Sequence, residues 1–168
     1  MVQAVVVMGV CGTGKTTVGQ MLSDKLGCPF LEGDSFHPPE NVEKMRAGLA
    51  LDDNDRWPWL NRLGRAMAKA KRQEANVITA CSALKRSYRD RLRHHVGSDT
   101  LFVLLHSDPA LLRDRLTKRA DHYMPPSLLD SQLAILEQPD SNECAISLDA
   151  ALPPDVLMER IEREIVGA

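Results

Sequence analysis

The fold is decided by the segment Gly9-Val10-Cys11-Gly12-Thr13-Gly14-Lys15-Thr16, which matches the pattern G-x-x-x-x-G-K-[ST] of a phosphate-binding loop. The run at residues 4–8 is apolar and β-branched, as expected of a buried strand. After the loop, apolar residues recur at helical spacing until Gly27, which is a helix stop signal. A strand, a glycine-rich loop and a helix in this order predict a P-loop that binds a nucleoside triphosphate.

Each part of the loop has a role in holding a triphosphate. Glycine at positions 9, 12 and 14 permits positive φ angles and lets backbone N–H groups converge on the phosphates. The helix that follows directs its positive end toward the same anions. Lys15 is expected to contact the β- and γ-phosphates, and the Thr16 hydroxyl is the expected ligand of Mg²⁺. We therefore predict that ATP contacts the whole loop, namely Gly9, Val10, Cys11, Gly12, Thr13, Gly14, Lys15 and Thr16.

Length and composition predict a single domain that covers residues 1–168. The hydrophobic fraction is 43% and the charged fraction 26%, both ordinary for a globular protein. A net charge of −2 gives no electrostatic reason to expect nucleic acid or a membrane surface as a partner. The four cysteines are scattered without a C-x-x-C pair, which argues against a zinc site or a disulfide framework and favours a cytoplasmic location. No apolar stretch approaches the roughly 20 residues of a membrane span.

Four more apolar runs predict strands at residues 29–31, 76–80, 100–105 and 145–148, with helical patterns between them. This alternation of strands and helices predicts an α/β fold with an open parallel sheet. In such a sheet the carboxyl ends of the strands face the ligand crevice. Residues that directly follow a strand are therefore candidates for the site.

The second predicted strand ends in Glu32-Gly33-Asp34, which brings two carboxylates to the expected crevice. Asp34 could accept the proton of an attacking hydroxyl or hold Mg²⁺ through water, and the alternative is that it caps the next segment. Glu32 would point to the same face of the strand as Asp34, where it could support Mg²⁺ through water or remain a solvated acid. The third predicted strand ends without an aspartate, so Asp34 and Glu32 are the main candidates for the acidic residues of the site.

Two groups of basic residues are candidates for binding an anion. Arg56 lies in the first turn of a predicted helix, where the helix dipole disfavours a cation by about 0.3–1 kcal/mol. It therefore either binds an anionic ligand or pairs with one of the acids at positions 52, 53 and 55. Lys85 and Arg89 lie four residues apart on one face of a later helix, at the end nearest the crevice, whereas the other basic residues there fit a solvated face.

A helix that starts at Pro109 carries Arg115 and Arg119 four residues apart, and prolines at positions 125 and 126 break the pattern after it. A cationic helix end followed by a loop is typical of a lid that closes over phosphates. We therefore predict a lid over approximately residues 115–127. Both arginines would then contact ATP, and Arg119 would neutralise charge on the transferring group as the lid closes. The alternative is that both arginines are solvated helix charges.

Three further blocks extend the pattern beyond the phosphate-binding loop. They are Gly33-Asp34-x-x-His37-Pro38-x-x-Asn41 with Asp53-x-Asp55-Arg56-x-Pro58-Trp59-Leu60, then Cys81-Ser82-Ala83-Leu84-Lys85-x-x-Tyr88-Arg89-Asp90, then Ser131-Gln132 through Leu136-Glu137-x-Pro139. Together these blocks resemble the gluconate kinases over nearly the whole chain. One departure is Glu32, which stands where that family is expected to have aspartate.

The resemblance implies a P-loop NTPase fold related to the nucleoside monophosphate kinases, with a five-stranded parallel sheet, flanking helices and a mobile lid, in keeping with the five predicted strands. It also implies a gluconokinase, which transfers phosphate from ATP to D-gluconate with Mg²⁺ and gives 6-phospho-D-gluconate and ADP. A cytosolic homodimer is the usual assembly of proteins that this chain resembles.

The residues at matching positions fit the parts of this reaction. The terminal hydroxyl of gluconate would lie near Asp34, and its carboxylate would bind a cation supplied by Arg56 or Arg89. The transferring phosphoryl group would be stabilised by Lys15, by Mg²⁺ on Thr16, and by Arg119. The remaining hydroxyls would bind the polar side chains of His37, Asn41 and Lys85.

Two other functions compete with this one. A kinase for another small acid or nucleotide, such as shikimate, would keep the fold and the phosphate site. A GTP-dependent switch is disfavoured, because the sequence has neither an N-K-x-D segment to bind guanine nor a D-x-x-G segment after the third strand.

Overall fold

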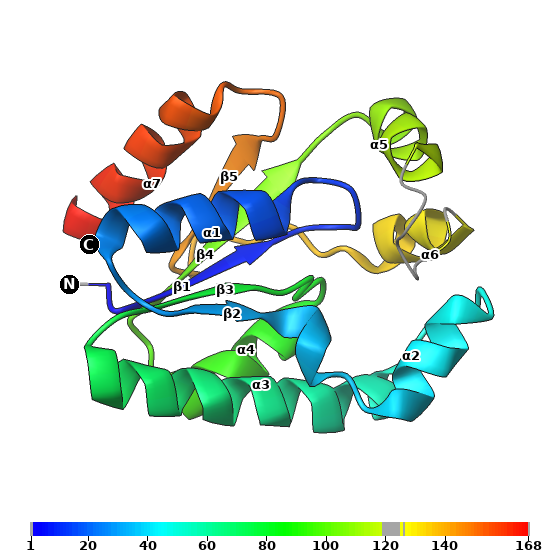
Figure 1. The fold of residues 1–168 in the computed structure, drawn as a ribbon, viewed down its shortest axis with the longest axis horizontal. Coiled ribbons are helices and arrows are strands. Elements are labelled where there is room, and N and C mark those ends of the chain that lie inside the picture. The colour runs from blue at the N-terminus through cyan, green and yellow to red at the C-terminus, as the bar shows by residue number, and fades with distance from the viewer. Residues whose placement is uncertain (1, 119–124, 126, 168) are drawn as a thin grey trace.

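The computed structural model describes residues 2–118, 125 and 127–167, and these form a five-stranded parallel sheet with helices on both faces (Figure 1). The order of the strands across the sheet is β2-β3-β1-β4-β5. The strands are β1 (Ala4–Met8), β2 (Phe30–Glu32), β3 (Val77–Ala80), β4 (Thr100–His106) and β5 (Ala145–Asp149). The predicted α/β fold with five parallel strands is therefore confirmed.

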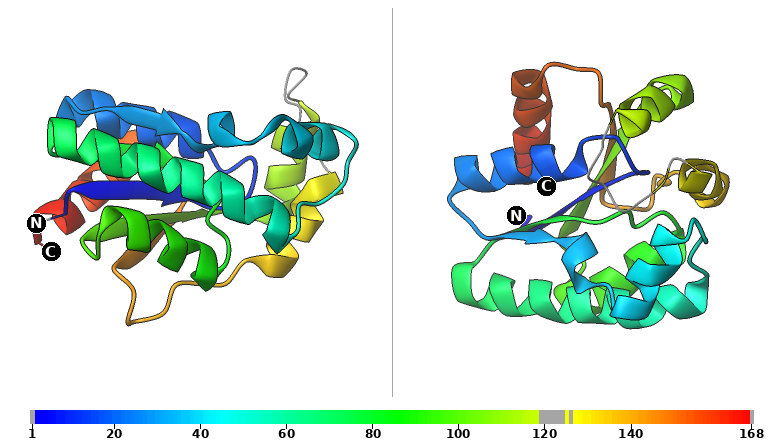
Figure 2. Two further views of the ribbon diagram at one scale, coloured as in Figure 1. Left: turned by 90° about the horizontal axis from the view of Figure 1, so that it is seen from below. Right: turned by 45° about the vertical axis from the view of Figure 1, so that its right-hand side comes forward.

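Two helices cover each face of the sheet (Figures 1 and 2). Helices α1 (Lys15–Leu26) and α7 (Pro154–Gly167) lie on one face, and α3 (Asp53–Glu74) and α4 (Arg86–Val96) lie on the other. Because side chains alternate along a strand, β1 contributes to both cores. Val5 and Val7 pack in the core with α1 and α7, whereas Val6 and Met8 pack in the core with α3 and α4. The central strand is thus buried on both sides, as a parallel sheet requires.

The remaining helices gather at the carboxyl end of the sheet, beside the P-loop (Figure 2). They are the 3₁₀ helix η1 (Gly33–Phe36), α2 (Pro39–Arg46), α5 (Pro109–Thr117) and α6 (Ser127–Ile135). The sequence pattern predicts that α6 continues to residue 138, but the helix ends at Ile135. The reason is that the Glu137 N–H donates to the carbonyl of Leu84 at 2.9 Å, in a different part of the chain.

The predicted lid falls largely on residues 119–124 and 126, which lie outside the described residues, and so does Arg119. The described part of that segment consists of the last turn of α5, Pro125 and the start of α6. Within the described chain, no helix combines the length and the apolar character that crossing a membrane demands.

Candidate active site

The P-loop joins β1 to α1 at the centre of the sheet, and its shape depends on glycine. Gly9 has a φ of +139°, and a Cβ atom at this position would lie only 2.5 Å from the carbonyl oxygen of Leu105. The carbonyl of Val10 accepts hydrogen bonds from the Thr13 hydroxyl at 3.0 Å and from the Lys15 ammonium at 2.9 Å. The loop is therefore closed on itself, and the Lys15 ammonium is held against it.

Helix α1 presents its amino terminus to the same place. Within the described chain, no side chain caps this helix at Gly14, so its first N–H groups point into the crevice without a side-chain acceptor. Free N–H groups and the positive end of the helix dipole form an anion site. This is the geometry that the sequence predicts for phosphate binding.

Glu32, the last residue of β2, connects the P-loop to η1. Its Oε2 atom accepts a hydrogen bond from the Thr16 hydroxyl at 2.6 Å, and its Oε1 atom accepts one from the Asp34 N–H at 3.3 Å. These three residues and Lys15 line a single cavity that opens to solvent. The structure therefore brings the two predicted carboxylates and the P-loop together.

The backbone around Asp34 is tightly fixed. A Cβ atom on the preceding residue, Gly33, would lie 2.3 Å from the carbonyl oxygen of Ala80, so only glycine permits η1 to approach β3 this closely. The indole N–H of Trp59 donates to the Gly33 carbonyl at 2.8 Å, which holds η1 from the other side. The Asp34 carboxylate remains 35% exposed and lines the cavity, so a ligand can reach it.

His37 lies on the cavity wall as a neutral hydrogen-bond donor. Its ring stacks on Trp59 with ring centroids 4.0 Å apart, and burial lowers its pKa to about 4. The amide nitrogen of Asn41 lies 3.2 Å from Nδ1 of His37, and an amide nitrogen can only donate. Nδ1 is therefore the acceptor, and Nε2, which lies 3.9 Å from the Asp34 carboxylate, carries the proton.

Asn41 itself is placed behind His37 and is not one of the described residues that line the cavity. It is buried, and its amide nitrogen also donates to the carbonyl of Asp55 at 2.9 Å. Asn41 is thus placed to set the tautomer and the orientation of the imidazole, and its direct contact with a substrate stays a prediction.

Arg56 supplies a buried positive charge to the cavity wall. The residue is only 7% exposed, and its Nη1 atom donates a hydrogen bond to the Tyr88 hydroxyl at 3.2 Å. Among the described residues, no carboxylate oxygen lies within 4.0 Å of its guanidinium group. A buried cation without a counter-ion is costly, so this position is suited to an anionic ligand.

The acids near Arg56 interact with other groups, which excludes the alternative that Arg56 forms an ion pair with one of them. Asp55 pairs with Lys44 at 2.6 Å, and Asp53 pairs with Lys85 at 2.8 Å. Asp52 caps α3 by accepting the N–H of Asp55 at 2.9 Å. Lys85, which the sequence predicts to bind a hydroxyl of the substrate, lies against Asp53 beside the cavity and is not among the described residues that line it.

The prediction that Arg89 binds a substrate is wrong. Its side chain is fully buried, and its Nε and Nη2 atoms each donate to the Glu143 carboxylate at 2.7 Å. Its third nitrogen, Nη1, donates to the backbone carbonyls of Ala83, Leu84 and Glu137. Every nitrogen of this guanidinium group is thus engaged inside the protein, so Arg89 holds the structure together.

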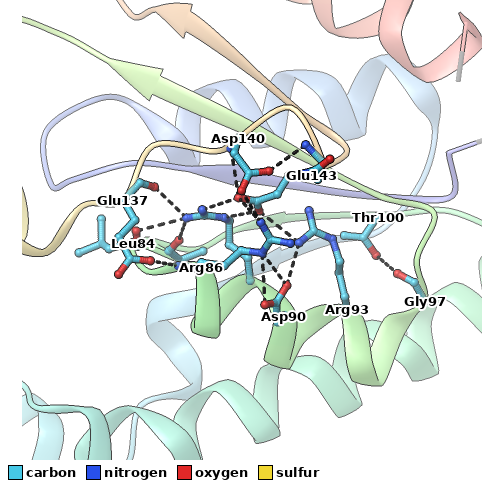
Figure 3. Close-up of polar contacts among 12 residues, drawn as sticks. Leu84, Arg86, Asp90, Arg93, Gly97, Thr100, Glu137, Asp140 and Glu143 are labelled. Atoms are coloured by element: carbon cyan, nitrogen blue, oxygen red, sulfur yellow. Dashed lines mark hydrogen bonds and ion pairs between the residues drawn. The ribbon is translucent and has the colours of Figure 1, made fainter.

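Glu143 is the centre of a larger ionic cluster between α4 and the segment that precedes β5 (Figure 3). Arg93 lies 3.2 Å and Arg86 lies 3.4 Å from its carboxylate. Arg86 also pairs with Asp140 at 2.8 Å and with Asp90 at 3.1 Å. The cluster attaches the segment after α6 to helix α4.

Gln132 is a cavity residue that was not among the site residues predicted from the sequence. It lies on α6, is buried, and accepts a hydrogen bond from the N–H of Cys11 at 2.7 Å. From α5, the predicted ATP ligand Arg115 donates to the carbonyl of Gly12 at 3.4 Å. The sequence pattern that could have identified Gln132 is the block Ser131-Gln132 through Leu136-Glu137-x-Pro139, to which it belongs.

The described residues contain no group of three or more His, Cys, Asp or Glu side chains placed to hold a metal. The Thr16 hydroxyl and the Glu32 carboxylate nevertheless offer the hard oxygen ligands that Mg²⁺ prefers. These donors fit a Mg²⁺ ion whose remaining ligands are phosphate oxygens and water, as is usual when the ion arrives with a nucleotide.

Comparison with known proteins agrees with this geometry. Residues 5–139 match a family model described as an AAA domain. The gluconokinase of Gluconobacter oxydans is 47% identical over 160 residues, which cover 94% of this chain and 88% of that protein.

Two crystal structures show the same fold. A gluconokinase from Sinorhizobium meliloti is 41% identical with a TM-score of 0.85, covering 98% of this chain and 92% of that one. A sugar kinase from a Janibacter species is 42% identical with a TM-score of 0.90, covering 99% and 95%. The chain therefore belongs to the gluconokinase family of P-loop kinases.

Proposed function

We propose that this protein transfers the γ-phosphoryl group of ATP to the terminal hydroxyl of D-gluconate, giving 6-phospho-D-gluconate and ADP. The observation that carries the proposal is one cavity that is lined both by the phosphate-site residues and by a buried cation. The phosphate-site residues are Lys15, Thr16 and Asp34, and the cation is Arg56, which has no carboxylate partner among the described residues. An acceptor that has a hydroxyl at one end and a carboxylate at the other matches both.

The proposed mechanism assigns a separate task to each group. Asp34 accepts the proton of the attacking hydroxyl, and Lys15 balances the charge on the phosphoryl group in transfer. Bound Mg²⁺ would be held by Thr16, with Glu32 acting through water, and would neutralise phosphate charge. Arg115 contributes to nucleotide binding from α5. Arg119 would neutralise the transferring group as a lid closes over it.

The acceptor would be oriented by two further lining residues, His37 and Arg56. The Nε2–H group of His37 can donate to a hydroxyl oxygen of the polyol, and its neutral ring does not compete for the carboxylate. The guanidinium of Arg56 can hold the carboxylate through two parallel hydrogen bonds. In this arrangement Asn41 acts through His37, and Lys85 acts through Asp53.

We also propose that the protein works as a homodimer in the cytoplasm, as the family resemblance implies. Its four cysteines are free, which suits a reducing compartment. Light scattering during gel filtration tests the dimer, since a mass near that of the 18.6 kDa chain would contradict it.

The first experiment compares acceptors in a coupled assay of ADP release with ATP and Mg²⁺. Gluconate is expected to give turnover well above that with shikimate, glucose or AMP. Faster turnover with shikimate or AMP would reject gluconate as the substrate while leaving the phosphate site intact. Equal binding of GTP and ATP without turnover that depends on an acceptor would instead favour a nucleotide switch.

Arg56→Ala is expected to raise the KM for gluconate about 10- to 100-fold, because a charged hydrogen-bond partner of the carboxylate is lost. The KM for ATP should stay within about twofold, since the P-loop is unchanged. The control is Arg62→Ala, which removes an exposed arginine from the same helix. An unchanged KM for gluconate together with a large loss of stability would contradict the role of Arg56.

A further inference from the structure

A chain of polar contacts leads from the cavity wall into the interface between α3 and α4. Arg56 donates to the hydroxyl of Tyr88 at 3.2 Å, and that hydroxyl donates in turn to the carboxylate of Asp53. The same carboxylate oxygen accepts a hydrogen bond from Lys85 at 2.8 Å. Asp53 and Arg56 come from the first turn of α3, and Lys85 and Tyr88 from the N-cap and first turn of α4, which packs against α3.

The direction of each hydrogen bond in this chain is fixed by chemistry. A guanidinium group can only donate, so the Tyr88 oxygen accepts from Arg56 and its own proton points to Asp53. Hydrogen bonds from Lys85 and Tyr88 lower the pKa of Asp53, and burial raises the pKa of Tyr88. The carboxylate thus stays ionised and the phenol stays protonated at neutral pH, and an ionised neighbour makes the phenol oxygen a better acceptor.

The placement of Tyr88 between the two charges matters for ligand binding. If Asp53 contacted Arg56 directly, the ion pair would satisfy the guanidinium and compete with an incoming anion. The phenol instead holds Arg56 through a neutral oxygen and leaves its positive charge for the ligand. Tyr88 is only 1% exposed and is not among the cavity-lining residues, so it acts from behind Arg56.

The Tyr88 ring is itself held rigidly. Trp57 packs edge-on against it with ring centroids 5.5 Å apart and an interplanar angle of 81°. The guanidinium carbon of Arg56 lies 5.3 Å from the ring centroid, and the Lys85 ammonium lies 5.5 Å from it. A fixed ring gives the hydroxyl one position, and therefore gives the Arg56 side chain one preferred direction.

We infer that Tyr88, held by Asp53 and Lys85, is a positioning residue that aims Arg56 at the carboxylate of the acceptor and so sets the preference for an acidic sugar over a neutral polyol. The inference rests on the proposed function, in which Arg56 binds the carboxylate of gluconate.

The test uses Tyr88→Phe, which keeps the ring and removes only the hydroxyl. The KM for gluconate should rise about tenfold, the scale of one hydrogen bond to a charged group, while kcat and the KM for ATP change little. D-glucitol, which carries a hydroxymethyl group where gluconate carries its carboxylate, serves as the neutral acceptor. The ratio of kcat/KM for gluconate to that for D-glucitol should fall by the same factor.

A double-mutant cycle shows whether Tyr88 works through Arg56. In an Arg56→Ala background, Tyr88→Phe should have no further effect on the gluconate-to-glucitol ratio, because the group that it aims is gone. Asp53→Asn should shift the ratio in the same direction as Tyr88→Phe. An undiminished effect of Tyr88→Phe in that background, or equal losses with both acceptors, would overturn the inference.

A matched control separates positioning from general loss of packing. Leu92→Ala opens a cavity in the core side of the same helix, so it should lower the melting temperature without changing the acceptor ratio. A shift of the ratio in Leu92→Ala as large as in Tyr88→Phe would identify the effect as structural and reject the inference.

The same variants distinguish a failure of the proposed function from a failure of the positioning role of Tyr88. If Arg56→Ala leaves the gluconate-to-glucitol ratio unchanged, Arg56 does not bind the carboxylate, and the proposed site and this inference both fall. If Arg56→Ala lowers the ratio and Tyr88→Phe does not, only the positioning role of Tyr88 is rejected.

Discussion

Asp34→Asn is expected to lower kcat with gluconate by about 10²- to 10⁴-fold, because an amide cannot accept the proton of the attacking hydroxyl. The side chain keeps its size, and the Gly33 backbone contacts that place it are unchanged. The KM values for both substrates and the melting temperature should therefore stay near those of the wild type. Initial rates at saturating ATP and gluconate measure the effect.

The control for this variant is Asp24→Asn, an exposed acid on α1 that hydrogen-bonds to Gln20. A titration with Mg²⁺ separates the two roles that Asp34 could have. If high Mg²⁺ restores the rate of Asp34→Asn, the carboxylate organises the metal and is not the base. An unchanged kcat would exclude both roles for Asp34, and η1 would still be capped by Glu32.

Glu143→Gln is expected to lower the free energy of unfolding by about 3–5 kcal/mol, because it leaves the buried guanidinium of Arg89 without its counter-ion. For a chain of this length that loss corresponds to a melting temperature lower by about 10 °C. The exposed pair of Glu159 and Arg163 provides the control, since Glu159→Gln should change the melting temperature very little. A loss no larger than that of the control would show that the cluster does not stabilise the fold.

The same carboxylate predicts how stability depends on pH. Burial alone would raise the pKa of Glu143, but hydrogen bonds from Arg89 and Arg93 and the nearby positive charges lower it from 4.5 to about 2. A depressed pKa stabilises the fold above the pKa of the unfolded chain, and this contribution is lost as the pH falls toward 2. The melting temperature of the wild type should therefore fall more steeply below pH 4.5 than that of Glu143→Gln.

Much of the phosphate end of the site could be predicted from sequence, because its signals are local. The P-loop motif, the preceding apolar strand and the following helix are contiguous, and so is the Glu32-Gly33-Asp34 segment at the end of β2. In a parallel sheet the ends of neighbouring strands share one edge, so topology alone brings these segments together. No long-range contact had to be known.

The acceptor end could be predicted only in part, because its cations depend on distant partners. Spacing along α4 placed Lys85 and Arg89 on one face, but it could not show that Glu143, 54 residues away, covers Arg89. The choice between an ion pair and a free cation at Arg56 likewise depended on Lys44 and Lys85 binding the nearby acids. Tertiary contacts of this kind leave no trace in the local pattern.

The contacts that α5 and α6 make with the P-loop have a thermodynamic consequence. Arg115 donates to the carbonyl of Gly12, and Gln132 accepts from the amide of Cys11, so both helices hold adjacent residues of the loop. If closing these helices over an acceptor tightens the loop around the nucleotide, linkage requires the nucleotide to tighten acceptor binding by the same factor. The dissociation constants for ATP and for gluconate should then depend on each other, and equal values with and without the second substrate would show that the two binding events are independent.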